Sequence, residues 1–131
     1  MDKQELVNLA VEAMEKAYAP YSGYKVGAAL ETAGGKVYLG CNIESVSFSP
    51  TNCAERTAFF KAVSEGERDF ASIAVVGGKD GEIAGMFPPC GVCRQVMAEF
   101  CDPDTFTIVL GKRDGYETYT LKELLPLGFN P

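Results

Sequence analysis

Histidine and tryptophan are absent from this sequence of 131 residues. Without imidazole, a metal ion at the cysteine-containing motifs would have to be held by thiolates, and a general base would have to be another kind of side chain. Long apolar runs are missing too, so we expect no membrane-spanning helix. Residues 1–5 contain acidic side chains where a secretion signal needs a basic and then an apolar region. We therefore expect a cytoplasmic protein.

Basic residues are scarce. The 12 lysines and arginines are outnumbered by 18 aspartates and glutamates, which gives a net charge of -6. A protein that binds a nucleic-acid polymer needs a basic groove, so this balance favours a small, nearly neutral substrate. The length fits one domain with its own hydrophobic core, and we expect a single catalytic domain over residues 1–131.

The apolar pattern predicts helices that alternate with strands. Helices are expected over residues 4–18, 53–65, 91–100 and 121–125, and strands over 25–30, 36–41, 71–76, 105–110 and 116–120. We expect Thr51 or Asn52 to cap the second helix and the glycine-rich residues 77–85 to form a loop. This order predicts a five-stranded sheet with helices on its faces. Small molecules bind such folds where helices follow strands.

Two short motifs at such junctions contain most of the reactive side chains, TNCAERTA (residues 51–58) and PPCGVCRQ (88–95). Cys90 and Cys93 lie two residues apart at a helix start, so both can bind one metal ion, and Cys53 can supply a third thiolate. Three protein ligands leave a position for water, as in catalytic zinc sites. Glu55 is placed to take a proton from that water. Arg56 can donate hydrogen bonds to the thiolates and offset their charge.

Two other interpretations fit parts of these motifs. A lone CxxC at a helix start is also typical of a thioredoxin-like dithiol, although Cys53 and Glu55 would then be unexplained. Alternatively, Cys41 or Cys101 could complete a purely structural zinc site. Taken singly, these two cysteines are more typical of buried core thiols. Five cysteines in a reducing compartment favour thiols or metal ligands over disulfides.

A Cys-Ala-Glu motif followed by Pro-Cys-x-x-Cys is the three-cysteine form of the zinc deaminase signature. Residues 19–129 closely resemble the small cytidine deaminases through this signature together with three further segments, APYSGYKVGAAL, GCNIE and ELLPLGF. The resemblance implies a three-layer α/β/α fold with a mixed five-stranded sheet. It also implies one Zn²⁺ per subunit, bound by Cys53, Cys90 and Cys93, and a homotetramer with shared active sites.

The reaction implied by this resemblance is the hydrolytic deamination of cytidine and 2'-deoxycytidine to uridine and 2'-deoxyuridine, with release of ammonia, in pyrimidine salvage. Zinc-activated water would attack C4 of the ring, and Glu55 would shuttle protons. Asn42 and Glu44 would hold the ribose hydroxyls. The Ala54 backbone would contact the pyrimidine ring.

Two aromatic residues would complete the site that the resemblance implies. Tyr24 would pack beside the pyrimidine ring, and Phe129 would stack on the base from a neighbouring subunit. The sequence departs from the family pattern at Tyr24, where phenylalanine is usual, and at Phe48, where tyrosine is common; both changes keep an aromatic ring. Deaminases of aminonucleoside antibiotics of the blasticidin type share the zinc motifs, but the NIE motif at residues 42–44 favours a free nucleoside.

Overall fold

The computed structural model describes residues 1–130. Its elements, in chain order, are α1 (Lys3–Met14), β1 (Tyr24–Thr32), β2 (Val37–Cys41), α2 (Ala54–Ser64), β3 (Phe70–Lys79), α3 (Gly91–Phe100), β4 (Thr107–Lys112), β5 (Gly115–Thr120) and α4 (Leu121–Leu124). The five strands form one sheet in the order β2-β1-β3-β4-β5. The β3–β4 pair is parallel and the other three pairs are antiparallel, so the predicted mixed sheet is confirmed.

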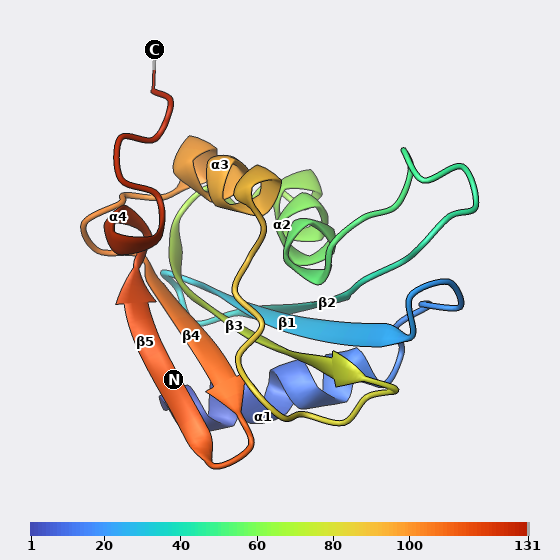
Figure 1. Cartoon of the computed structure of the whole chain (residues 1–131). Helices are drawn as coiled ribbons and strands as arrows, with labels where there is room; N and C mark the ends of the chain where they lie inside the picture. Colours follow the sequence, from blue (N-terminus) through green and yellow to red (C-terminus); the bar gives the residue numbers. More distant parts are fainter. Residues whose placement is uncertain (131) are drawn as a thin grey trace.

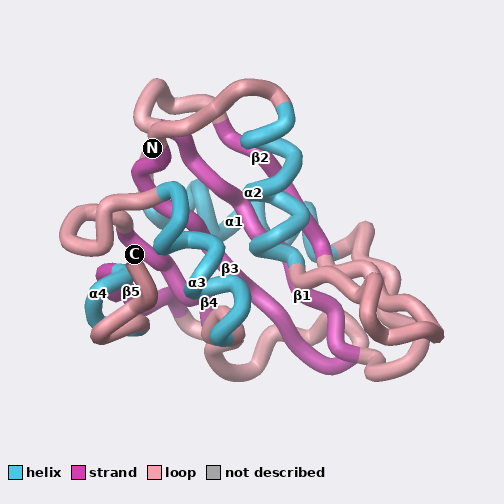
Figure 2. Tube along the Cα trace, turned by 90° about the horizontal axis from the view of Figure 1, so that it is seen from above, coloured by secondary structure: helices cyan, strands magenta, loops and turns pink. Residues whose placement is uncertain are grey.

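Helices cover both faces of the sheet. Helix α1 lies on one face, and α2 and α3 lie side by side on the other (Figures 1 and 2). Alternate residues of a strand point to opposite faces, and β1 follows this rule: Ala29 packs in the cluster under α1, whereas Ala28 and Leu30 pack in the cluster under α2 and α3. The predicted three-layer architecture is therefore confirmed. Within residues 1–130, no helix is both long enough and apolar enough to span a bilayer.

Close contact between α2 and the sheet depends on a glycine. Gly40 of β2 lies under the start of α2, and a Cβ atom at this position would stand 2.5 Å from the carbonyl oxygen of Ala54 and 2.6 Å from the amide nitrogen of Ala58. Only glycine allows the two backbones to approach this closely. The height of the first turn of α2 above the sheet is therefore set by backbone contact with β2.

The first helix ends earlier than the predicted residue 18. It stops at Met14 because the chain then turns to pair with the segment after β2. The amide of Tyr18 donates to the carbonyl oxygen of Asn42 at 3.0 Å, and the amide of Glu44 donates to the carbonyl oxygen of Tyr18 at 2.9 Å. These bonds hold the residues after α1 against the end of β2.

The loop after β2 is closed at its base. The amide of Ile43 donates to the carbonyl oxygen of Asn52 at 3.0 Å, and the amide of Asn52 donates to the carbonyl oxygen of Ile43 at 2.9 Å. Between these two residues the chain extends away from the sheet (Figure 1). The bridge places Asn52, and with it the start of α2, next to the residues that follow β2.

The prediction of a loop over residues 77–85 is wrong at its first residues, because β3 continues to Lys79. Gly77 and Gly78 are strand residues that pair with β1. A Cβ atom at Gly78 would overlap the carbonyl oxygen of Glu82. The glycines therefore allow the following loop to fold back onto the strand.

Candidate active site

The three predicted metal-binding cysteines meet where α2 and α3 begin. Cys53 precedes the first turn of α2, Cys90 precedes that of α3, and Cys93 lies within the latter turn. Their sulfur atoms all lie within 4.8 Å of one another. Cys90 Sγ is 3.7 Å from Cys53 Sγ and 3.5 Å from Cys93 Sγ. Tetrahedral ligands with zinc–sulfur bonds of about 2.3 Å stand about 3.8 Å apart, so this cluster fits a zinc ion.

The start of α2 differs from the prediction that Thr51 or Asn52 caps the helix. Cys53 occupies the capping position in an extended conformation, with φ -75° and ψ 155°, and its side chain makes no capping bond. The Thr51 hydroxyl instead accepts from the Ser45 amide, and the Asn52 side chain donates to the Thr57 hydroxyl. The sulfur of Cys53 is consequently available to the cluster.

Positive charge around the cluster favours thiolates. The Arg56 guanidinium donates to Cys53 Sγ at 3.3 Å. A hydrogen bond from Cys93, together with this arginine, lowers the pKa of Cys53 to about 5 against the opposing effect of burial. The same hydrogen bond and burial raise the pKa of Cys93. Both helices also direct their N-terminal ends, which carry partial positive charge, toward the sulfurs. Cys53 therefore ionises more readily than Cys93.

Glu55 lies in the first turn of α2 and is 4% exposed. Burial, reinforced by the charge of Cys53, raises the pKa of its carboxyl to about 7. Arg56 acts in the opposite direction but does not cancel the effect of burial. A carboxyl whose pKa is close to neutral can both accept and donate a proton at physiological pH, which is the property that a general acid–base catalyst needs.

A cavity of about 320 Å³ lies against this cluster. The cavity is lined by six of the residues that the sequence analysis assigned to the site: Asn42, Glu44, Cys53, Ala54, Glu55 and Cys90. Five further lining residues were not predicted: Val26, Thr51, Asn52, Phe87 and Pro88. Thr51, Asn52 and Pro88 belong to the two cysteine motifs and Phe87 directly precedes the second, which is the sequence signal that could have identified these four. Val26 lies in β1, so its place at the cavity follows from strand pairing, which the motifs do not encode.

Asn42 and Glu44 are held at the cavity by hydrogen bonds to β1 and to the loop before it. The Asn42 side chain accepts from the Val26 amide and donates to the Tyr24 carbonyl, both at 2.8 Å. The Glu44 carboxylate accepts from the amides of Tyr21 and Ser22 and from the Ser22 hydroxyl. These contacts lower the pKa of Glu44, with the Ser22 hydroxyl as the largest cause. A negative carboxylate and an oriented amide therefore lie at one wall of the cavity.

The two predicted aromatic residues lie outside this lining. Tyr24 is 44% exposed, and its ring lies 5.8 Å from that of Phe87, a residue of the cavity wall. Phe129 is 73% exposed, and its backbone is bonded to the side chain of Gln95 on α3. Within one chain, the structure therefore brings Tyr24 to the edge of the site and leaves the Phe129 ring in solvent.

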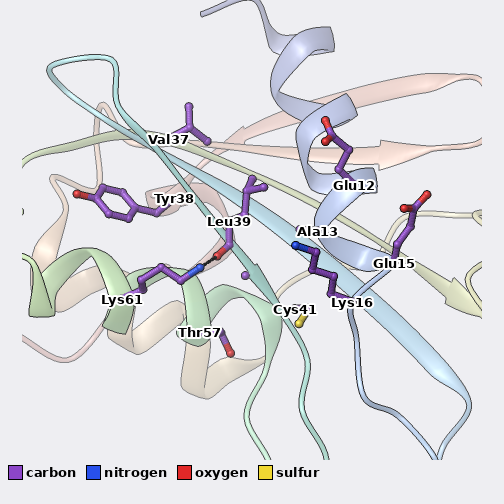
Figure 3. A pocket seen from close by; sticks show the side chains of 11 residues that line it. Glu12, Ala13, Glu15, Lys16, Val37, Tyr38, Leu39, Cys41, Thr57 and Lys61 are labelled. Carbon is purple, nitrogen blue, oxygen red and sulfur yellow. Dashed lines mark hydrogen bonds between the residues drawn. The ribbon is translucent and has the colours of Figure 1, made fainter.

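Cys41 and Cys101 do not belong to the cluster in residues 1–130. Cys41 lines a separate groove of about 450 Å³ along the free edge of β2, between α1 and α2 (Figure 3). In this groove the Lys61 ammonium donates to the Leu39 carbonyl. Cys101 is buried at the end of α3, and burial raises the pKa of its thiol to about 12. With neither thiol close enough, a structural site closed by a fourth cysteine finds no support.

Comparison with known families identifies the cluster. Residues 1–109 match the family model described as the cytidine and deoxycytidylate deaminase zinc-binding region. This chain is a member of that family. It is 52% identical over 130 residues to a cytidine deaminase of Halalkalibacterium halodurans, covering 98% of this chain and 95% of the relative. It is 47% identical over 130 residues to a cytidine deaminase of Sporosarcina psychrophila, covering 99% of this chain and 93% of the relative.

A crystal structure of a cytidine deaminase from Burkholderia pseudomallei has the same fold. Its TM-score is 0.90 at 48% sequence identity, and the alignment covers 98% of this chain and 100% of that one. Membership of this zinc-binding family makes zinc the metal for the three-cysteine cluster. The thioredoxin-like interpretation of Cys90 and Cys93 is accordingly set aside.

Proposed function

We propose that this chain, as one catalytic domain, hydrolyses cytidine and 2'-deoxycytidine to uridine and 2'-deoxyuridine with release of ammonia. One observation carries the proposal: in a member of the cytidine deaminase family, a buried glutamate lines the same cavity as two of the three converging cysteines. The net charge of -6 supports a nucleoside over a nucleic-acid polymer. A place in pyrimidine salvage, and in the cytoplasm, is part of the same proposal.

The cluster would hold the zinc ion through Cys53, Cys90 and Cys93. Bound zinc supplies a Lewis acid and a water molecule that is nucleophilic at neutral pH. The Arg56 guanidinium, 3.3 Å from Cys53 Sγ, offsets the charge of the thiolates, which would otherwise weaken that Lewis acid. The role proposed for Arg56 is therefore electrostatic, and it does not contact the substrate.

Glu55 moves the protons of the reaction. It takes up a proton as water adds to C4 of the pyrimidine ring, and it delivers a proton to N3. A second proton then passes, through Glu55, from the hydroxyl that water has added at C4 to the amino group, which leaves as ammonia when its bond to C4 breaks. Water and cytidine thus give uridine and ammonia. Because its pKa is raised to about 7, the Glu55 carboxyl can serve as base and then as acid at neutral pH.

We propose that the substrate is held by other residues in or beside the cavity. Asn42 and Glu44 bind the sugar hydroxyls, because each retains hydrogen-bonding capacity after its contacts with the β1 region. The backbone of Ala54, at the start of α2, contacts the pyrimidine ring. Tyr24, beside Phe87, packs at the edge of the ring.

We also propose that the active enzyme is a homotetramer in which Phe129 completes the site of a neighbouring subunit. The Phe129 side chain is 73% exposed, and Leu127, two residues earlier in the chain, is fully exposed, although both are apolar. The outer surface of α2 and α3 adds an apolar groove between Phe60 and Val92, which are also exposed. Exposed apolar surface of this kind is typical of a surface that a partner covers.

The direct test is an assay of purified, zinc-loaded protein with cytidine, followed by ultraviolet absorbance and by ammonia release. We expect uridine and ammonia in equal amounts, with zinc bound at one ion per subunit. Glu55→Gln serves as the inactive control. Zinc binding without turnover of either nucleoside would refute the proposed function. Turnover of blasticidin-type aminonucleosides alone would refute the proposed substrate class.

A further inference from the structure

The Glu44 carboxylate is held by the short loop that precedes β1. One of its oxygens, Oε1, accepts from the amides of Tyr21 at 3.0 Å and Ser22 at 3.1 Å. The other, Oε2, accepts from the Ser22 hydroxyl at 2.5 Å. The loop and the carboxylate are separated by more than twenty residues in the sequence, and they meet because Tyr18 pairs with Ile43.

The Ser22 hydroxyl has a defined direction in this arrangement. Its oxygen accepts from the amide of Tyr24 at 3.0 Å. A hydroxyl has one proton to donate, and here the donated bond goes to Glu44. The result is a chain of hydrogen bonds that runs from the start of β1, through Ser22, to the carboxylate at the cavity wall.

The number of hydrogen bonds that the carboxylate can accept explains the effect of this chain of hydrogen bonds on Glu44. An ionised carboxylate has about four lone-pair positions. The loop occupies three of them, two on Oε1 and one on Oε2. One position remains on Oε2, the oxygen that Ser22 contacts. A donor that enters the cavity therefore meets a single acceptor position, whose direction is fixed by the serine.

We propose that Ser22 is a positioning residue that fixes the Glu44 carboxylate to accept a sugar hydroxyl, and that it thereby sets the preference of the enzyme for nucleosides bearing those hydroxyls. This inference rests on the proposed function, since it assigns a role at the sugar end of the same cavity. Ser22 does not contact the reacting atoms; it acts through Glu44. Its effect is confined to substrate binding and does not extend to the proton transfers of Glu55.

The experiment compares two substrates in the zinc-loaded enzyme. Cytidine carries 2'- and 3'-hydroxyls on its sugar, whereas 2',3'-dideoxycytidine lacks both and keeps only the 5'-hydroxyl. For Ser22→Ala we expect KM for cytidine to rise by a factor on the order of five, as for loss of one hydrogen bond, with kcat unchanged. KM for the dideoxy substrate should stay the same. Ser22→Thr, which keeps the hydroxyl, should restore the value for cytidine.

Two further variants separate positioning from a merely structural role. Ser64→Ala removes a serine hydroxyl that, within residues 1–130, bonds only to the Lys61 carbonyl at the end of α2, and it should leave both KM values unchanged. In a Glu44→Gln background, Ser22→Ala should have little additional effect on KM for cytidine, because the two residues act as a unit.

The outcomes are distinct. If the unaltered enzyme fails to convert cytidine, the proposed function itself is refuted. If it converts cytidine but Ser22→Ala leaves KM for cytidine unchanged, the positioning role is refuted and the function stands. An equal rise in KM for both substrates would also overturn the inference, because it would mean that the variant merely loosens the loop.

Discussion

Replacing Gly40 with alanine is expected to move the active site without changing any residue in it. A Cβ atom at this position would stand 2.5 Å from the Ala54 carbonyl oxygen, whereas ordinary contact begins at 3.4 Å. The shortfall is about 0.9 Å. Both atoms that it would meet most closely are backbone atoms of α2, so no side-chain rotation can relieve the overlap. The first turn of α2 must move away from β2 by a similar distance.

This displacement has two measurable effects. Overpacking of this kind costs about 2 kcal/mol, which in a domain of this size lowers Tm by about 8 °C. The first turn of α2 also carries Glu55 and follows Cys53. Because a misplacement of about 1 Å at a reacting centre can cost about 100-fold in rate, we expect kcat for cytidine to fall by roughly that factor. Zinc affinity should weaken as well.

Thermal unfolding and steady-state kinetics, measured on the same zinc-loaded preparation, test both effects. Gly85→Ala is the matched control, because a Cβ atom there would meet nothing of the described residues 1–130 within 4 Å and its backbone is not in the left-handed region. The control should keep both Tm and kcat. If Gly40→Ala also kept both, the close approach of α2 to β2 would not determine the geometry of the site, and the reasoning would fail.

Three further predictions concern the site directly. Glu55→Gln should lower kcat by at least about 100-fold in steady-state kinetics. Metal analysis should show that the variant keeps zinc, and calorimetry should show a Tm shift of less than about 4 °C. Near-normal turnover would exclude the proton shuttle. If Phe129 acts across subunits, co-expressed Glu55→Gln and Phe129→Ala chains should regain activity in about one quarter of sites, those that combine an intact Glu55 with an intact Phe129 from the neighbour. If Phe129 acts within one chain, the mixture should show no activity above that of Phe129→Ala alone. A chelator should abolish turnover and added zinc should restore it, with the far-ultraviolet circular dichroism of the sheet retained; irreversible unfolding would assign the metal a structural role instead.

The cysteine motifs could be predicted from the sequence because their geometry is local. The CxxC spacing at a helix start allows two sulfurs to share a metal, and the structure places Cys90 and Cys93 in that position. The third sulfur, from Cys53, comes from a separate helix start. Its approach depends on α2 and α3 lying side by side on one face of the sheet (Figures 1 and 2), a tertiary arrangement that the motifs alone do not specify.

The surroundings of the site could not be predicted in the same way. The contact between Ser22 and Glu44 joins residues 22 positions apart and depends on how the chain after α1 pairs with the end of β2. Gly77 and Gly78 look like a turn in the sequence but lie in β3, because the folded loop needs space that only glycine leaves. In both cases the deciding contact is tertiary, so no local pattern records it.

The bridge between Ile43 and Asn52 has a consequence for how this enzyme can change over evolutionary time. Its two hydrogen bonds fix both ends of the intervening loop at one point, and the metal-binding helix starts just beyond it. Doubling the length of a closed loop costs only about 0.6 kcal/mol, so insertions within the exposed residues 46–50 leave the zinc-binding geometry almost untouched. The same loop carries the exposed Phe48. Variation in length and sequence can therefore accumulate here while the chemistry is inherited intact.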